Sequence, residues 1–363
     1  MSQILGNLSA LTWQMAAMWA IGGVMIYLAI CKEMEPTLLL PMGFGCILCN
    51  LPNSGAVEVL ETLFQAGVAN ELFPLLLFIG IGAMIDFEPL ITNPKLMILG
   101  AFAQLGIFVT IILATLLGFN INDAAAIGII GAADGPTSIL VALRLGSSYV
   151  GPIMVVAYSY MALVPIIQPA VIKCCTTKKE RLIRMDDNTR HASKSVKIFF
   201  PIIITVVSGL IAPKSLSLIG FLMFGNLIKE CGVLGSLADT AKTTLCNLIT
   251  LLLGITIAFR MQADMFLSVQ TLMIMGLGLF AFVFDTVGGV MCAKVMNLFC
   301  KKKINPMIGA AGISAFPMSA RVVHKMGLHE DNTNYLLMHA VGANVSGQVA
   351  SAIVGGLILG LVL

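Results

Sequence analysis

The sequence places one carboxylate, Asp134, inside an apolar run at a point where a helix must break. The run extends over residues 127–138, and Gly135-Pro136 follows the carboxylate directly. Proline lacks the backbone donor of the helical ladder, and an interruption at membrane depth is tolerated where its carbonyls line a cavity or bind a ligand. An ionisable residue at such a place is a functional-site hypothesis, so Asp134 is the leading candidate for a cation-binding carboxylate. The alternative is an aspartate that caps a helix at the membrane surface.

The same pattern occurs twice in the chain. At an offset of 181 residues, Ile127, Gly128, Gly131, Pro136, Ser138, Val141 and Gly146 recur as Ile308, Gly309, Gly312, Pro317, Ser319, Val322 and Gly327. The copies differ in chemistry, because Ala315 stands at the place of Asp134 and the second copy adds Ser314 and Arg321. Self-similarity of this kind indicates a duplicated unit, and paired Gly/Pro-interrupted segments in two halves point to a transporter's binding site.

Composition identifies the class of protein. Hydrophobic residues make up 58% and charged residues 11% of the 363 residues, where soluble domains carry about a quarter charged residues. The sequence therefore predicts an all-α polytopic membrane protein. The net charge of +3 gives no indication of nucleic-acid binding, because the cations lie in short loops. None of the nine cysteines forms a convincing metal set.

The elements that must position the two breaks divide into four parts. We expect an N-terminal transmembrane helix within residues 1–36, a first membrane repeat at 37–172, a basic loop at 173–197 and a second membrane repeat at 198–363. The loop carries seven of the chain's cations between Lys178 and Lys197, and the positive-inside rule places it in the cytoplasm.

Counting crossings predicts how the repeats are related. If Lys32, Lys95, the 173–197 loop and Lys301–Lys303 all face the cytoplasm, residues 124–146 enter and leave on the outer side. Five membrane crossings then lie between equivalent helices of the two repeats. Because five is an odd number, the second repeat is inverted relative to the first. The sequence thus predicts inverted-topology repeats with about ten transmembrane helices, an outside N-terminus and two broken or re-entrant elements at 124–146 and 305–327.

Three longer motifs resemble a known family. They are Gly131-Ala-Ala-Asp-Gly-Pro-Thr137, the stretch from Asn305 to Val322, and Met338-His-Ala-Val-Gly-Ala-Asn-Val-Ser-Gly347. Together they are similar to the beta subunit of sodium-translocating, biotin-dependent decarboxylases, which include the oxaloacetate, methylmalonyl-CoA, glutaconyl-CoA and malonate enzymes. The resemblance extends over nearly the whole chain.

The resemblance implies a division of labour among subunits. A carboxyltransferase alpha subunit would move a carboxyl group from an acid onto biotin on a carrier protein or domain. The beta subunit would then decarboxylate carboxybiotin and drive Na⁺ outward across the cytoplasmic membrane. A small gamma or delta membrane subunit and further beta copies are the other implied partners. Biotin itself would belong to a partner, because this sequence lacks the Met-Lys-Met attachment site.

The resemblance also assigns roles to residues. Asp134 resembles the Na⁺-binding carboxylate and Tyr160 the tyrosine of ion or proton handling. Arg321 matches the cation expected in catalysis and in contact with carboxybiotin. The remaining expected Na⁺ ligands are Asn305, Gly309, Ser314 and Asn344. Each side chain also has a structural interpretation: Arg321 as an ion-pair partner, Tyr160 as a packed phenol, Ser314 and Asn305 as helix caps, and Asn344 as a link between helices.

Two other functions compete with the pump subunit. An autonomous sodium/carboxylate symporter or sodium/proton antiporter would share the repeats and the carboxylate. A purely structural membrane anchor would not need two broken helices with embedded polar residues. The sequence does not identify the acid that the complex would decarboxylate, because that acid would bind another polypeptide.

Overall fold

The computed structural model describes residues 9–185, 191–300 and 302–363, and every regular element in these ranges is a helix. This confirms the predicted all-α class. Arg190 and Lys301, two of the cations expected on the cytoplasmic side, lie outside the described residues, as does the start of the expected N-terminal helix region.

The first half of the chain contains ten α-helices and one short 3₁₀ helix. In order they are α2 (Trp13–Cys31), α3 (Pro36–Cys49), α4 (Ala56–Gly67), α5 (Leu72–Met84), α6 (Glu88–Thr92), α7 (Leu96–Phe102), α8 (Leu105–Leu116), α9 (Ile121–Gly128), η1 (Ile129–Ala132), α10 (Gly135–Arg144) and α11 (Val150–Cys175). A short helix, α12 (Lys178–Arg181), follows in the basic segment.

The second half repeats this order with local changes. Its elements are α13 (Lys194–Ile211), η2 (Pro213–Ser215), α14 (Leu216–Glu230), α15 (Gly235–Thr240), η3 (Ala241–Leu245), α16 (Cys246–Ile257), η4 (Ala258–Arg260), α17 (Ala263–Phe266), α18 (Val269–Phe299), α19 (Met307–Ala310), α20 (Met318–Glu330) and α21 (Leu337–Val362).

The count of about ten spans was too high. Among the described residues, seven helical stretches are long and apolar enough to cross a membrane, and the bent pair α4–α5 (62°) makes an eighth. Helices α3 and α14 are not among these stretches, because they have only 14 and 15 residues. At 1.5 Å per residue such helices reach about 21–23 Å, short of a hydrocarbon core of about 30 Å.

The two halves pack against each other reciprocally. Helix α3 of the first half lies against α16 of the second, and α14 of the second lies against α5 of the first. A Cβ on Gly45 of α3 would press on the Cβ of Ala258, directly after α16, and a Cβ on Gly225 of α14 would press on the backbone of Ile79. Contacts that are exchanged in this way are typical of a two-fold relation, which supports the duplicated unit predicted from the sequence.

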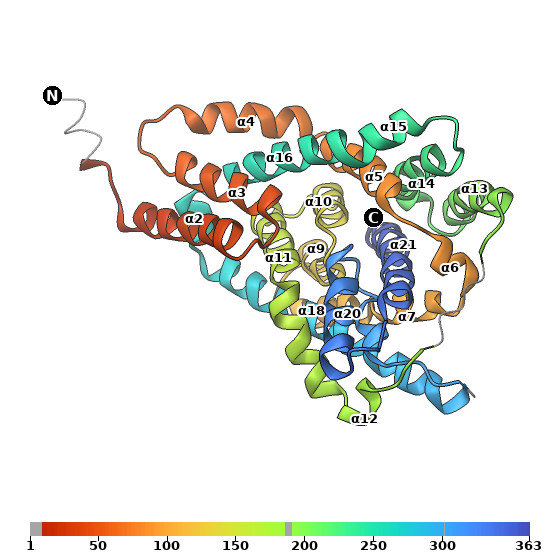
Figure 1. Cartoon of the computed structure of the whole chain (residues 1–363). Helices are drawn as coiled ribbons and strands as arrows, with labels where there is room; N and C mark the ends of the chain where they lie inside the picture. The colour runs from red at the N-terminus through yellow and green to blue at the C-terminus, as the bar shows by residue number, and fades with distance from the viewer. Residues whose placement is uncertain (1–8, 186–190, 301) are drawn as a thin grey trace.

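Both predicted breaks are present. In the first, called break 1 (residues 129–134), η1 ends at Ala133 in the left-handed region (φ 51°) and Asp134 is extended before α10 begins. In the second, called break 2 (residues 311–317), the chain leaves α19 after one turn and re-enters a helix only at Met318. Figure 1 shows α9, α10, α20 and α21 in the middle of the molecule, between α2–α3 on one side and α13–α14 on the other.

The breaks lie in the interior of the fold. Every residue of break 1 is buried, and most of break 2 is buried as well. The surrounding core consists of aliphatic residues from α7, α11, α18 and α21. Backbone groups freed by the breaks are therefore shielded from lipid, as a membrane interior requires.

Candidate functional site

Asp134 is the N-cap of α10 and is 2% exposed. Its Oδ2 accepts hydrogen bonds from Thr137 Oγ1 (2.6 Å), Gln348 Nε2 (3.1 Å) and Ser351 Oγ (3.1 Å). From the residues that the structure describes, its Oδ1 accepts one long bond, from the Thr137 amide at 3.5 Å. A carboxylate has about four acceptor positions, so one oxygen of Asp134 is held by donors while the other can still take a cation.

Helix α21 supplies the wall opposite Asp134. Asn344, Gln348 and Ser351 follow the i, i+4, i+7 spacing of one helix face, and all three are buried. Asn344 donates through Nδ2 to the carbonyl of Ile313 in break 2 at 2.6 Å. Its Oδ1 has no hydrogen-bond partner in the part of the chain that the structure describes. A buried amide oxygen without a donor is the kind of group that a hard cation such as Na⁺ would satisfy.

Ser314 joins the two breaks. Its backbone amide donates to the carbonyl of Ala132 in break 1 at 3.1 Å, and its hydroxyl donates to the carbonyl of Gly347 on α21 at 2.9 Å. The structure therefore brings together three of the predicted site residues, Asp134, Ser314 and Asn344, around break 1, break 2 and α21. We call these residues, with Gln348 and Ser351, the Asp134 cluster.

Two other predicted residues, Asn305 and Tyr160, make different contacts. Asn305 donates to the carbonyls of Arg181 and Ile183 (2.9 and 2.8 Å), and its Oδ1 accepts from the amide of Met307, as in a helix cap. The hydroxyl of Tyr160 donates to the carbonyl of Met275 on α18. None of these hydrogen-bond partners belongs to the Asp134 cluster.

Gly309, also predicted as a ligand, lies in α19 at a close helix contact. A Cβ at this position would press on the backbone carbonyl of Gly289 in α18. Its own carbonyl accepts a hydrogen bond from the amide of Gly312 at 3.0 Å. The structure thus gives Gly309 a packing role, and its predicted role as an ion ligand has no contact in support.

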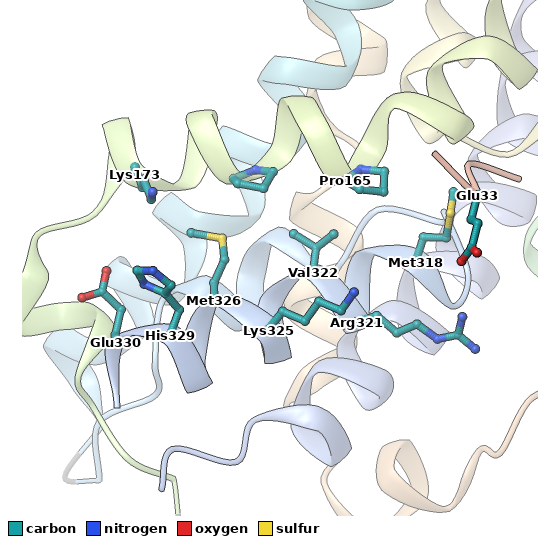
Figure 2. A pocket seen from close by; sticks show the side chains of 11 residues that line it. Glu33, Pro165, Lys173, Met318, Arg321, Val322, Lys325, Met326, His329 and Glu330 are labelled. Atoms are coloured by element: carbon teal, nitrogen blue, oxygen red, sulfur yellow. The ribbon is translucent and has the colours of Figure 1, made fainter. Parts of the chain in front are cut away.

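Arg321 lines an open pocket of about 480 Å³ between α11 and α20. Figure 2 shows Arg321 and Lys325 leaving α20 in the same direction, toward the end of the pocket where Glu33 lies, with Lys173 on the facing α11. None of the three cations forms a salt bridge among the described residues. The pocket thus offers three uncommitted positive charges to an anion.

The acids of the pocket offset this charge only in part. Glu33, which also lines the pocket, forms no salt bridge among the described residues. Glu330 is paired with Arg181 at 2.6 Å, and Arg181 lies outside the pocket lining. Glu35, in the loop between α2 and α3, is close enough to Arg321 to be affected by it: burial raises the pKa of Glu35, and Arg321 opposes that rise. Because Arg181 belongs to the basic segment, the pocket opens beside the segment predicted to be cytoplasmic.

The sequence interpretation missed several polar residues of the site. Thr137, Gln348 and Ser351 all donate to Asp134. Tyr158 also adjoins it: the ring lies against Gly135, and its buried hydroxyl has no hydrogen-bond partner among the described residues. The signal that could have found Gln348 is the repeat itself, because Gln168 precedes it by 180 residues, the offset that relates Phe44-Gly45 to Phe224-Gly225.

The two glutamines act reciprocally. Gln348, which follows break 2 in the chain, donates to Asp134 in break 1. Gln168, which follows break 1, donates to the Ala310 carbonyl and to Ser319 Oγ beside break 2, both at 2.7 Å. Break 1 is therefore held by a side chain of α21, in the second half, and break 2 by a side chain of α11, in the first half.

Comparison with known proteins matches this architecture to one family. The family model described as the Na⁺-transporting oxaloacetate decarboxylase beta subunit matches residues 14–362. The methylmalonyl-CoA decarboxylase subunit beta of Veillonella parvula is 48% identical over 352 residues, which cover 97% of this chain and 94% of the relative. The glutaconyl-CoA decarboxylase subunit beta of Acidaminococcus fermentans is 48% identical over 355 residues (97% and 94%), and the oxaloacetate decarboxylase beta chain of Klebsiella pneumoniae is 41% identical over 412 residues (96% and 95%).

Proposed function

Because the chain belongs to the beta-subunit family of Na⁺-transporting decarboxylases, we propose that it decarboxylates carboxybiotin presented by a partner protein and couples this step to outward Na⁺ transport. The chain is a multi-pass membrane protein and a subunit of a larger decarboxylase complex. Family membership favours this function over the autonomous symporter or antiporter that the sequence alone left open.

The observation that carries the proposed ion site is the contact between the two breaks beside a half-satisfied carboxylate. Asp134 Oδ1 and Asn344 Oδ1 are both buried oxygens. Among the described residues, the first accepts one long hydrogen bond and the second accepts none. Na⁺ takes oxygen ligands, and one ionised carboxylate balances its charge in a buried site. We propose that Asp134, Asn344 and Ser314 are ligands of Na⁺. Asn305 and Gly309 would instead hold break 2, which carries Ser314, in position.

The observation that supports carboxybiotin as substrate is the cationic pocket. Arg321 presents a planar fork of donors that suits a carboxylate, and Lys173 and Lys325 add point charges. Carboxybiotin supplies an N-carboxylate whose loss as CO₂ consumes one proton. The role of the three cations is to hold and orient that carboxylate, and Tyr160 remains a proposed participant in proton handling.

The complex implies partners and an orientation. We propose a carboxyltransferase alpha subunit, a biotin carrier protein or domain and a small gamma or delta membrane subunit, together with other beta copies. The basic segment 173–197 would face the cytoplasm, so that the carrier reaches the pocket beside it. The three relatives are beta subunits of decarboxylases that are named for three different substrates. This agrees with recognition of the acid by another polypeptide.

The test is reconstitution of the beta subunit in sealed vesicles, with a carboxylated biotin carrier protein as the probe. We expect CO₂ release that requires Na⁺, moves Na⁺ across the membrane and is lost in Asp134→Asn. Arg321→Ala should raise the KM for the carrier at least tenfold, whereas Lys179→Ala, outside the pocket, should leave it unchanged. Full CO₂ release by Asp134→Asn without Na⁺ would refute the coupling, and Na⁺-driven solute uptake without the carrier would favour the autonomous transporter.

A further inference from the structure

Helix α18 carries a buried carboxylate, Asp285, that the proposed function has not used. It is 0% exposed, in the middle of a 31-residue apolar helix. Its Oδ1 accepts a hydrogen bond at 2.5 Å from the amide of Gly106, in the first turn of α8. Its Oδ2 has no hydrogen-bond partner among the described residues. A carboxyl oxygen buried without a donor is costly unless a proton or a cation occupies it.

The free oxygen of Asp285 lies directly against break 1. A Cβ at Gly131 would be 2.5 Å from Oδ2, so only glycine leaves room for this approach. Break 1 is therefore flanked by two carboxylates, its own Asp134 toward α21 and Asp285 from α18. A movement of break 1 would change the surroundings of both.

The repeat provides an internal comparison. The residue 181 positions before Asp285 is Gln104, and the residue 181 positions after Gly131 is Gly312. Gln104 lies against break 2 in the same way, with its Nε2 donating to the carbonyl of Gly312 at 3.5 Å. The duplicated contact is thus maintained by a neutral amide in one copy. The contact between Asp285 and break 1 therefore does not in itself require a titratable side chain.

No cation neutralises Asp285 among the described residues. Helices α7, α8 and α19 and the 3₁₀ helix η1, which pack against α18, carry no titratable side chain. The titratable groups of the other neighbours and of α18 are Asp123 on α9, Tyr158, Tyr160, Lys173, Cys174 and Cys175 on α11, and Cys292 and Lys294 on α18. Asp123 is held by Ser147 Oγ at 2.6 Å, and Lys294 is paired with Glu180 at 3.0 Å.

We propose that Asp285 holds the proton that each decarboxylation consumes, and this proposal rests on the proposed function. In the anionic state the amides at the start of α8 stabilise Oδ1. In the other state an O–H bond forms at Oδ2 with a proton from water, and no electron is transferred. The proton leaves as that O–H bond breaks and ends on the ureido nitrogen of biotin, where an N–H bond replaces the N–C bond that breaks as CO₂ departs. A proton suits this place better than Na⁺, because helix amides rather than oxygen ligands surround Oδ1.

The first test is Asp285→Asn, since asparagine keeps an oxygen for the Gly106 amide but cannot titrate. We expect Na⁺-dependent thermal protection to remain, because Asp134 is intact. Turnover with the carboxylated carrier should fall at least tenfold at pH 8, less at pH 6, with loss of proton uptake measured by a pH-sensitive dye. The matched variant Asp123→Asn, a buried aspartate with serine donors, should keep the wild-type pH profile. A wild-type profile in Asp285→Asn would overturn the proposal.

The second test uses the wild-type protein and does not depend on turnover. A hydrophobic carbodiimide reacts with protonated carboxyl groups in apolar surroundings, and mass spectrometry identifies the modified residue. We expect modification of Asp285 that increases between pH 9 and pH 6. No modification across this range would overturn the proposal. Modification that Na⁺ suppresses in an Asp134→Asn background would make Asp285 a Na⁺ site instead, and would overturn it equally. Carbodiimide modification in a protein without decarboxylase activity would refute the proposed function alone.

Discussion

At the scale of single residues, the two oxygens of Asp134 have different surroundings. Three donors converge on Oδ2, whereas Oδ1 accepts one bond at 3.5 Å. Donors to a carboxylate favour its ionised form, so the bonds to Oδ2 offset part of the cost of burying the charge while the other oxygen remains open to a cation. The two oxygens thus serve different purposes: Oδ2 favours the ionised carboxylate, and Oδ1 is available to bind the cation.

The first prediction follows for Ser351→Ala, which removes one donor from Oδ2. A hydrogen bond to a charged group contributes about 1.5–3 kcal/mol, and about 1.4 kcal/mol is tenfold in affinity. The Na⁺ concentration for half-maximal thermal protection should rise about tenfold, more strongly at low pH because protons then compete for the carboxylate. Ser346→Ala is the matched control, since this serine lies on the same helix but donates to the carbonyls of Leu96 and Ala343. Equal effects of the two variants would contradict the assignment.

The residues that could be predicted are those with a local anomaly. Asp134 is a charge next to Gly-Pro in an apolar run, and that combination has few explanations. Gln348 and Ser351 are ordinary uncharged polar residues of a membrane helix, where contacts between helices alone would account for them. Only the fold shows that they point at the carboxylate. Asp285 had a signal of the same kind as Asp134, an isolated charge in an apolar helix, but no adjacent break to draw attention to it.

At the scale of elements, reciprocal helix pairs hold the two halves together through close backbone approach. Helix α14 contains a matched pair of glycines that tests this. A Cβ at Gly225 would press on the backbone of Ile79 in α5, whereas a Cβ at Gly220 meets nothing within 4 Å. The first position is part of the interface between halves, and the second faces away from it.

The second prediction is that Gly225→Ala destabilises the protein and Gly220→Ala does not. Forcing two packed backbones apart costs about 1–3 kcal/mol, and replacing a helical glycine by alanine in open space gains about 0.5–1 kcal/mol. The midpoint of thermal unfolding in detergent should fall for the first variant and stay level or rise for the second. The same fall for both would show that the α5–α14 contact is not the cause.

The third prediction concerns the connection between the basic segment and the end of α20. Arg184 pairs with Asp331 at 2.6 Å. The Thr333 amide and hydroxyl together with Arg184 lower the pKa of Asp331 to about 2 from its usual 3.8. A carboxyl group whose pKa is lowered on folding stabilises the fold above its unfolded pKa, and this contribution disappears as the pH falls through the folded pKa. Residues 176–185 should therefore detach from α20 as the pH falls from about 4 toward 2.

Hydrogen exchange of this segment at a series of pH values would measure the detachment. Asp331→Asn should increase exchange there at pH 7, because the ion pair with Arg184 is lost. Asp239→Asn breaks the exposed pair with Lys242 (2.7 Å) and should leave the segment unchanged. Unaltered exchange in Asp331→Asn would show that the segment is held by other contacts.

At the scale of the whole molecule, the duplication was predictable and the number of spans was not. The repeated Gly/Pro pattern identified two equivalent halves and located both breaks. Counting apolar stretches gave a somewhat higher number than the structure indicates, because a short helix inside a membrane protein is as apolar as a spanning one. Whether a helix is long enough to cross the bilayer is clear only when its first and last residues are known, as they are for α3, which ends before its C-cap Asn50.

The fourth prediction is the orientation of the molecule. Cys174, exposed at the end of α11, should react with a membrane-impermeant maleimide only from the cytoplasmic side when it is the single cysteine. A cysteine introduced at Ser148, exposed after break 1 and α10, should react only from the outer side. Labelling of both from one side would contradict the predicted path of residues 124–146 and the inverted relation of the repeats.

One hydrogen bond has a particular consequence for experiments that vary the sequence. The amide of Ser314 donates to the carbonyl of Ala132, so main-chain atoms link the two breaks directly, beside the side-chain contacts of Gln348 and Gln168. Exchange of side chains leaves such a link in place, and an alanine scan would pass over the strongest candidate for communication between the halves. Proline at 314, or an ester bond introduced there by protein semisynthesis, would remove the donor. Substitution of the surrounding side chains would therefore leave this one bond in place, whatever it does to the side-chain contacts beside it.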